Sequence, residues 1–316
     1  MLPNARSLRK FPPMLALSTC WNSHRHTNGE EMLREIVDLG FKNIELSHGL
    51  NVSMFDGILK FAERGEVNFT SLHNFCPQPV EVMTDSPDCY EFTSSRPEIR
   101  QRAVKTTLQT IEYAARLGAK RIVIHSGSVS AMRGYTRKLI GMILNGDFVS
   151  KAYAEEKLRG VQEREAVSHD YIRRVSETLK PVIEAAGEKG IRLGIENRDS
   201  YEAFPSEREF PEYLDALGPV AGYWHDFGHA QRKENMGFLD HREWLEKIAH
   251  RAIGCHLHDT RWPVEDHCVP FTGDIDYHEL VPLFPKDIPF VIELHPKREA
   301  AQIAAAAERW RREFGE

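Results

Sequence analysis

The chain has 316 residues, of which 41% are hydrophobic and 28% charged, so it can bury a large core. A mean hydropathy of -0.46 and the lack of an apolar run near 18 residues exclude a transmembrane helix. The net charge of -6 offers no general attraction to polyanions, and we expect no nucleic-acid partner. Five cysteines without a C-x-x-C pair argue against a complete disulfide framework.

The first thirteen residues contain three basic side chains but lack the long apolar stretch of a signal peptide. We therefore expect a cytoplasmic protein that has no membrane partner.

Eight short runs rich in β-branched residues alternate with amphipathic stretches along the chain. The predicted strands are residues 14–20, 41–47, 68–73, 120–125, 191–196, 220–226, 252–258 and 288–294. Several are almost wholly apolar, which is typical of strands buried on both faces of a parallel sheet. Eight strand-then-helix units predict a (β/α)8 TIM barrel, with residues 1–316 forming a single domain. A doubly wound sheet fits less well, because no G-x-G-x-x-G turn follows the first strand.

Proline and glycine mark the expected helix ends. Pro97 suits the first turn of the helix before the fourth strand, and Gly118 suits its C-terminal end. Gly40 and Gly190 end two other helices in the same way.

Two connections are longer than a barrel requires: residues 74–96 after the third strand, and residues 127–168, with an extra helix, after the fourth. Both follow strand C-termini, where barrel enzymes build their sites. They are candidate lids or surface insertions.

Six consecutive predicted strands end in a His, Asp or Glu, which would bring these side chains to one rim. The residues are His73, His125, Glu196, Asp226, His256 with His258, and Glu293 with His295. Any one of them could be structural; Asp226, for example, could simply cap the next turn. Three carboxylates buried together need a cation, however. Glu196, Asp226 and Glu293 with His256 form an oxygen-rich set that suits one Mn²⁺, Mg²⁺ or Co²⁺ ion, with Zn²⁺ also possible.

The motifs that carry these residues occur in a characteristic order. They include Gly194-Ile195-Glu196-Asn197, Asp226-x-x-His229, His256-Leu257-His258-Asp259 and Gly273-Asp274-Ile275-Asp276. In this order and spacing the chain resembles the xylose-isomerase-like TIM barrel superfamily of sugar isomerases and epimerases, which also contains the family-2 AP endonucleases.

The resemblance to ketose 3-epimerases implies roles for particular positions. Glu196, Asp226, His256 and Glu293 match the metal ligands, and the two glutamates match the groups that exchange the sugar proton. His229 and Arg261 match substrate-binding residues. Glu202 matches a further active-site glutamate, although the intervening residues are ordered differently. His73 and His125 match histidines that contact substrate in many sugar-acting relatives. Apart from the resemblance, Trp21, just after the first strand, could form part of an aromatic wall over a sugar ring or could serve only to pack the loop.

These roles imply that a small keto- or aldo-sugar loses a proton to give an enediolate. Return of the proton gives epimerisation or isomerisation, whereas loss of a β-hydroxyl would make the protein a dehydratase or lyase of a keto-sugar or inosose. A sugar-binding barrel without catalysis would need a degraded ligand set, and all four ligands are present. Relatives are often dimers or tetramers, so a homo-oligomer is possible.

The rival function is that of an AP endonuclease with three zinc ions. His73, His125 and His229 match its ligands, and Glu265-Asp266-His267 falls where that branch has Asp-x-His. The negative net charge, the aromatic and proline-rich 74–96 segment and the first strand argue against it. If the chain is a sugar enzyme, His267 becomes a further candidate substrate contact.

Overall fold

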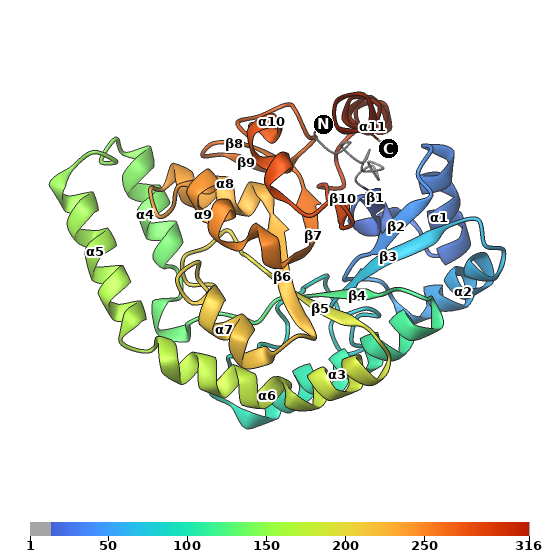
Figure 1. Ribbon diagram of the computed structural model, residues 1–316, viewed down its shortest axis with the longest axis horizontal. Coiled ribbons are helices and arrows are strands. Elements are labelled where there is room, and N and C mark those ends of the chain that lie inside the picture. The colour runs from blue at the N-terminus through green and yellow to red at the C-terminus, as the bar shows by residue number, and fades with distance from the viewer. Residues whose placement is uncertain (1–13, 316) are drawn as a thin grey trace, which may run out of the picture.

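The eight predicted strands form a closed parallel barrel in the order β1-β10-β7-β6-β5-β4-β3-β2, which confirms the (β/α)8 fold (Figure 1). The computed structural model describes residues 14–315, so the basic N-terminal segment discussed above lies outside the described residues. Each barrel strand falls within its predicted range.

The barrel strands are β1 (Met14–Ser18), β2 (Asn43–Leu46), β3 (Asn68–His73), β4 (Arg121–Ile124), β5 (Arg192–Glu196), β6 (Ala221–Asp226), β7 (Ala252–Leu257) and β10 (Pro289–Ile292). The helices are α1 (Gly29–Asp38), α2 (Phe55–Glu63), α3 (Pro97–Arg116), α4 (Tyr135–Leu144), α5 (Lys151–Glu165), α6 (Ser168–Glu188), α7 (Phe210–Leu217), α8 (Phe227–Asn235), α9 (His241–Ile248), α10 (Tyr277–Leu280) and α11 (Ala300–Phe314). None of the helices in the described part of the chain has the length and apolarity needed to cross a bilayer.

The predicted helix boundaries are confirmed. Pro97 occupies the first turn of α3, where its missing N–H would have no helical partner in any case. Gly40, Gly118 and Gly190 follow α1, α3 and α6 with φ values of 86°, 73° and 63°, the left-handed conformation that glycine adopts most readily at a helix end.

The core consists mainly of apolar side chains packed between the barrel and its helices. A smaller cluster fills the barrel interior below the strand ends, with Trp224 as its largest member. The Trp224 ring lies edge-on to His256, with ring centroids 5.2 Å apart. The indole therefore packs against His256 from the barrel interior.

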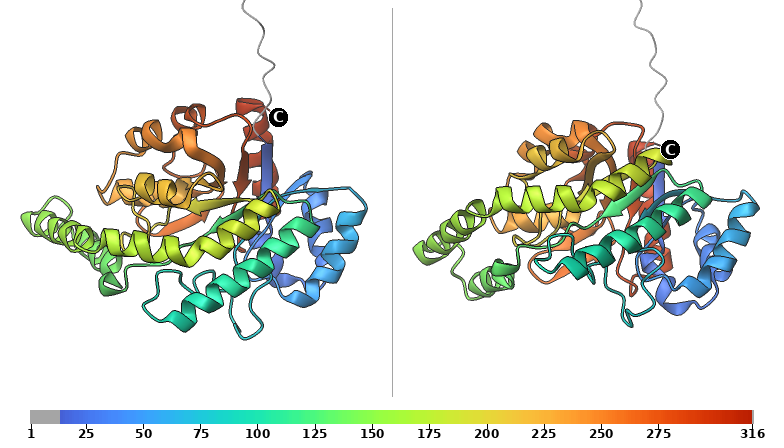
Figure 2. Two further views of the ribbon diagram at one scale, coloured as in Figure 1. Left: turned by 60° about the horizontal axis from the view of Figure 1, so that its bottom comes forward. Right: turned by 90° about the horizontal axis from the view of Figure 1, so that it is seen from below.

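Both predicted long connections are present. Residues 74–96 join β3 to α3 without regular secondary structure, and the connection after β4 holds two extra helices rather than one. These helices, α4 and α5, project from one side of the barrel (Figures 1 and 2). An antiparallel hairpin that the sequence analysis did not predict, β8 (Asp259–Arg261) with β9 (Glu265–Cys268), follows β7.

Candidate metal centre

The four predicted metal ligands come together at the C-terminal ends of their strands. Glu196 and Asp226 are the last residues of β5 and β6, His256 lies near the end of β7, and Glu293 follows β10. One ligating atom from each lies within 4.8 Å of the others. All four side chains are buried. Parallel strands in a barrel all end at one rim, which is why residues far apart in the sequence meet here.

His256 is oriented by a carboxylate that the sequence analysis did not assign to the site. Its Nε2 lies 3.1 Å from Oε1 of Glu45, on β2, and Glu45 in turn accepts a hydrogen bond of 2.7 Å from the Ser71 hydroxyl. Glu45 is fully buried. Donation from Nε2 to Glu45 leaves the lone pair on Nδ1, the arrangement usual for a metal-bound histidine with a carboxylate behind it.

The Nδ1 atom of His256 faces all three carboxylates. It lies 3.2 Å from Glu196 Oε1, 3.3 Å from Glu293 Oε2 and 3.8 Å from Asp226 Oδ2. A lone pair surrounded by three anionic oxygens is unstable unless a proton or a cation lies between them.

The pKa shifts of these side chains follow from this crowding. Burial alone would lower the pKa of His256, but Glu293, Glu45 and Glu196 raise it well above its ordinary value. Burial alone would raise the pKa of Glu196, but His125 and His256 hold it well below its ordinary value. A proton on His256 thus lies where a divalent cation would neutralise the surrounding carboxylates. The four side chains fit such an ion.

His73 and His125 face the other oxygen of Glu196. Their Nε2 atoms lie 3.3 Å and 2.7 Å from Glu196 Oε2. The Nδ1 atom of His73 lies 3.0 Å from the Asn74 carbonyl oxygen, and that of His125 lies 3.0 Å from Asp88 Oδ1. If each Nδ1 donates its proton to that oxygen, the lone pair on each Nε2 is directed at Glu196 Oε2. As at His256, such an arrangement needs a proton or a cation between the nitrogen and the carboxylate.

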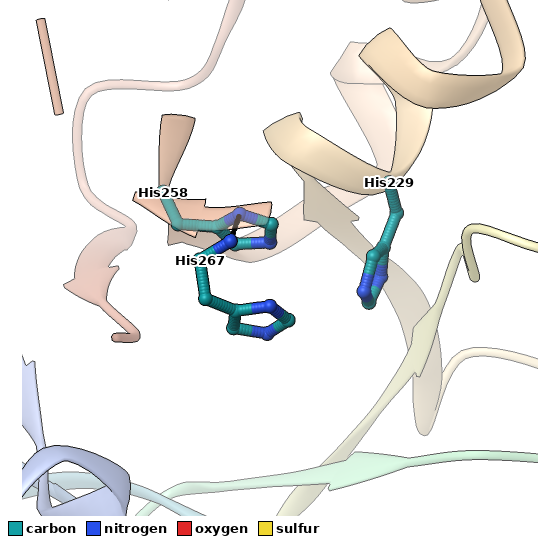
Figure 3. Close-up of side chains that lie close together, drawn as sticks. All are labelled: His229, His258 and His267. Atoms are coloured by element: carbon teal, nitrogen blue, oxygen red, sulfur yellow. Dashed lines mark hydrogen bonds between the residues drawn. The ribbon is translucent and has the colours of Figure 1, made fainter. Parts of the chain in front are cut away.

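Three further histidines lie beside the centre (Figure 3). The rings of His258 and His267 stack with centroids 3.9 Å apart, and the ring of His229 comes from α8 beside them. The backbone N–H of His267 donates to His258 Nδ1, and His258 Nε2 donates to Asp226 at 2.9 Å. With both nitrogens engaged, His258 orients Asp226 and has no lone pair for a metal.

Asn197 joins the ends of β5 and β6 at the centre. Its amide nitrogen donates to the carbonyl of Asp226, and its amide oxygen accepts from the N–H of Asp226 and the hydroxyl of Tyr223. The carbonyl of Asn197 also accepts from His229 Nδ1 at 3.0 Å, which leaves Nε2 of that ring free. Asn197 therefore positions one ligand and fixes the tautomer of a neighbouring histidine.

A cavity of about 240 Å³ opens onto the centre. This volume is below the usual range for drug-sized ligands and suits a small molecule. The residues that line it are Cys20, His48, His73, Pro87, His125, Glu196, Arg198, His229, His267, Glu293, Leu294, His295 and Pro296. Four predicted substrate-binding residues, namely His73, His125, His229 and His267, are among them.

The other three predicted substrate-binding residues lie outside the cavity lining. The carboxylate of Glu202 accepts hydrogen bonds from the backbone N–H groups of Gly134 and Thr136, and so caps the N-terminus of α4. Arg261 is exposed on the β8–β9 hairpin. Trp21 is buried, and its indole N–H donates to a backbone carbonyl. A substrate contact from any of the three stays a prediction.

Sequence reasoning missed Glu45, Asp88 and Asn197. A signal did exist for Glu45, because a carboxylate in the otherwise apolar run Ile44-Glu45-Leu46 must face a polar partner inside the barrel. Asp88 lies in an irregular loop, whose path has no periodic pattern from which its contact with His125 could be predicted.

The chain belongs to the xylose isomerase-like TIM barrel family, whose sequence profile matches residues 33–314. An uncharacterized protein of Methanocaldococcus jannaschii is 25% identical over 255 residues, which cover 80% of this chain and 79% of that one. A D-tagatose 3-epimerase-like protein superposes with a TM-score of 0.66 at 18% identity, covering 94% of this chain and 96% of its own. The IolI protein with a bound zinc atom superposes with a TM-score of 0.63 at 14% identity, covering 96% and 98%. At these identities, the structural similarity concerns the fold.

Proposed function

We propose that the protein is a divalent-metal-dependent isomerase or epimerase of a small sugar, with Glu196 and Glu293 as both metal ligands and acid/base groups. One observation supports this above the others: three buried carboxylates surround Nδ1 of His256. This donor set suits Mn²⁺, Mg²⁺ or Co²⁺. Zn²⁺ remains an option, and zinc is bound in the related IolI structure.

When bound, the ion would polarise a sugar carbonyl and stabilise the negative charge that develops on it. The two glutamates supply the proton transfer. Although burial raises it, the pKa of Glu293 is held well below its ordinary value by His256 and His267, so this side chain is ionised, as a general base must be before it accepts a proton. Glu196 is ionised for the same reason, next to His125 and His256.

His267 is suited to stabilise a charged oxygen near Glu293. Its Nε2 lies 3.7 Å from Glu293 Oε2. Although burial lowers it, the pKa of His267 is raised to about 10 by Asp266 and Glu293, so the ring carries a proton at neutral pH. We propose that His73, His125 and His229, all in the cavity lining, contact the sugar hydroxyls.

The same site would also serve a dehydratase or lyase of a keto-sugar or inosose, since the common step is removal of a proton next to a carbonyl. The products distinguish the two: loss of water from the substrate indicates a lyase, and conservation of mass an isomerase or epimerase.

The AP-endonuclease alternative finds partial support. His73, Glu196 and His256 bring ligating atoms within 4.8 Å of one another and could hold a further cation. Of the residues matched to a third ion, His229 and His267 lie together with His258, with one ligating atom from each within 4.8 Å of the others. Glu265 does not join them, because it is directed to Arg261 at 3.2 Å and to Arg298 at 3.6 Å. The proposed sugar enzyme therefore fits this chain better.

The test is proton exchange between sugars and solvent. Wild-type protein loaded with Mn²⁺ is incubated with keto-sugars in D₂O, and deuterium incorporation is followed by NMR. Glu196→Gln and Glu293→Gln should each abolish exchange without loss of fold by circular dichroism. The matched control is Glu212→Gln, which changes an exposed carboxylate on α7 and should leave exchange unaltered. Undiminished exchange in both glutamate variants would sink the mechanism.

A further inference from the structure

We infer that Cys20, His48 and Glu293 form a second cation site at the cavity, and that this site takes thiophilic divalent ions such as Zn²⁺ and Cd²⁺. One ligating atom from each of the three residues lies within 4.8 Å of the others. Cys20 follows β1, His48 follows β2 and Glu293 follows β10, and these three strands are neighbours in the barrel. All three residues line the cavity.

His48 is already oriented as a metal-binding histidine would be. Its Nδ1 lies 2.6 Å from Asp85 Oδ1, in the 74–96 segment. A carboxylate on one ring nitrogen is the usual partner of a histidine that binds metal through the other nitrogen. For His48, that other nitrogen is Nε2.

A glycine lies beside the Asp85–His48 pair. Gly49 has a φ of 81°, and a Cβ atom at this position would lie 2.5 Å from the Asp85 carboxylate. Any other residue would strain the backbone here and would require the Asp85 side chain to shift.

The donor atoms select a different kind of ion from the main centre. Sulfur, nitrogen and a single carboxylate oxygen favour Zn²⁺ or Cd²⁺, whereas the main centre offers three carboxylates and no sulfur. Glu293 and Asp85 supply negative charge beside the position. On binding, the S–H bond of Cys20 is replaced by a bond from sulfur to the metal, and the proton leaves to solvent.

The two sites share Glu293. A thiophilic ion that binds this carboxylate draws it away from the main centre, so occupation of the second site should inhibit the reaction. This consequence rests on the proposed function, whereas ion binding itself does not.

Cadmium is the probe for the site, because a cadmium–thiolate bond gives an ultraviolet charge-transfer band. Protein treated with a chelator and then saturated with Mg²⁺ is titrated with Cd²⁺. We expect one equivalent of Cd²⁺ to produce the band in the wild type. The band should vanish in Cys20→Ser, and His48→Asn should weaken binding by about tenfold or more.

The matched control is Cys89→Ser, which removes a half-buried thiol that does not line the cavity. This variant should bind Cd²⁺ as the wild type does. The inference is overturned if no band forms, if the band survives Cys20→Ser, or if Cys89→Ser removes it. The main centre contains no sulfur, so this readout is independent of sugar turnover and fails or succeeds separately from the proposed function.

Discussion

Replacement of Glu45 by Gln tests whether the carboxylate behind His256 controls metal binding. The change keeps the shape of the side chain and an oxygen that can accept from His256 Nε2, now 3.1 Å from Glu45 Oε1, but it removes a buried negative charge. Loss of such a partner typically weakens metal affinity by about 10- to 100-fold. This corresponds to about 1.4–2.8 kcal/mol of binding free energy.

The effect should fall at the strong end of this range, because Glu45 is fully buried and water cannot screen its charge. Isothermal titration with Mn²⁺ gives the affinity, and circular dichroism checks the fold. The matched control is Glu31→Gln, which changes an exposed carboxylate on α1 and should bind Mn²⁺ as the wild type does. An affinity for Glu45→Gln within about twofold of the wild type would refute the reasoning.

Two further predictions concern stability. Although partial burial raises it, the pKa of Glu35 is lowered to about 2 by its hydrogen bond with Arg25 and other partners. Because the pKa is depressed in the folded state, ionised Glu35 stabilises the fold above pH 4.5, and this stabilisation is lost as the pH falls toward 2. Glu35→Gln should therefore lower the free energy of unfolding in urea by about 1 kcal/mol or less at pH 7, because the pair is partly exposed. A difference that is as large at pH 2 as at pH 7 would contradict the assignment. Gly254→Ala should destabilise the protein by about 1–3 kcal/mol, because the new Cβ would overlap the buried Trp224 ring. Gly187→Ala, a helical glycine with only an ordinary contact at 3.5 Å, should instead stabilise by about 0.5–1 kcal/mol, and equal melting temperatures for the two variants would be inconsistent with this packing.

The barrel and the meeting of its four candidate ligands could be predicted because both depend on periodic patterns. Near-continuous apolar runs locate parallel strands, and a strand's last residue must lie at the common rim. For this reason the sequence alone predicted that Glu196, Asp226 and His256 lie close together, although they come from distant segments of the chain.

The remaining parts of the site depend on tertiary contacts that leave no such pattern. The position of Glu202 could not be predicted, because its carboxylate binds the N-terminus of a helix in another long connection. The β8–β9 hairpin is similarly short and polar, and it carries Arg261 away from the cavity. Loop geometry of this kind is set by side-chain partners rather than by hydrophobic period.

The position of Glu45 links the metal centre to closure of the barrel. All four ligands lie on β5, β6, β7 and just after β10, in the second half of the chain, yet the carboxylate that orients His256 comes from β2 in the first half. In the strand order, β2 and β7 are separated by β1 and β10, so the contact exists only when the ring of strands is complete. A fragment with every ligand would lack the oriented imidazole, and tight metal binding would then be a property of the whole closed barrel.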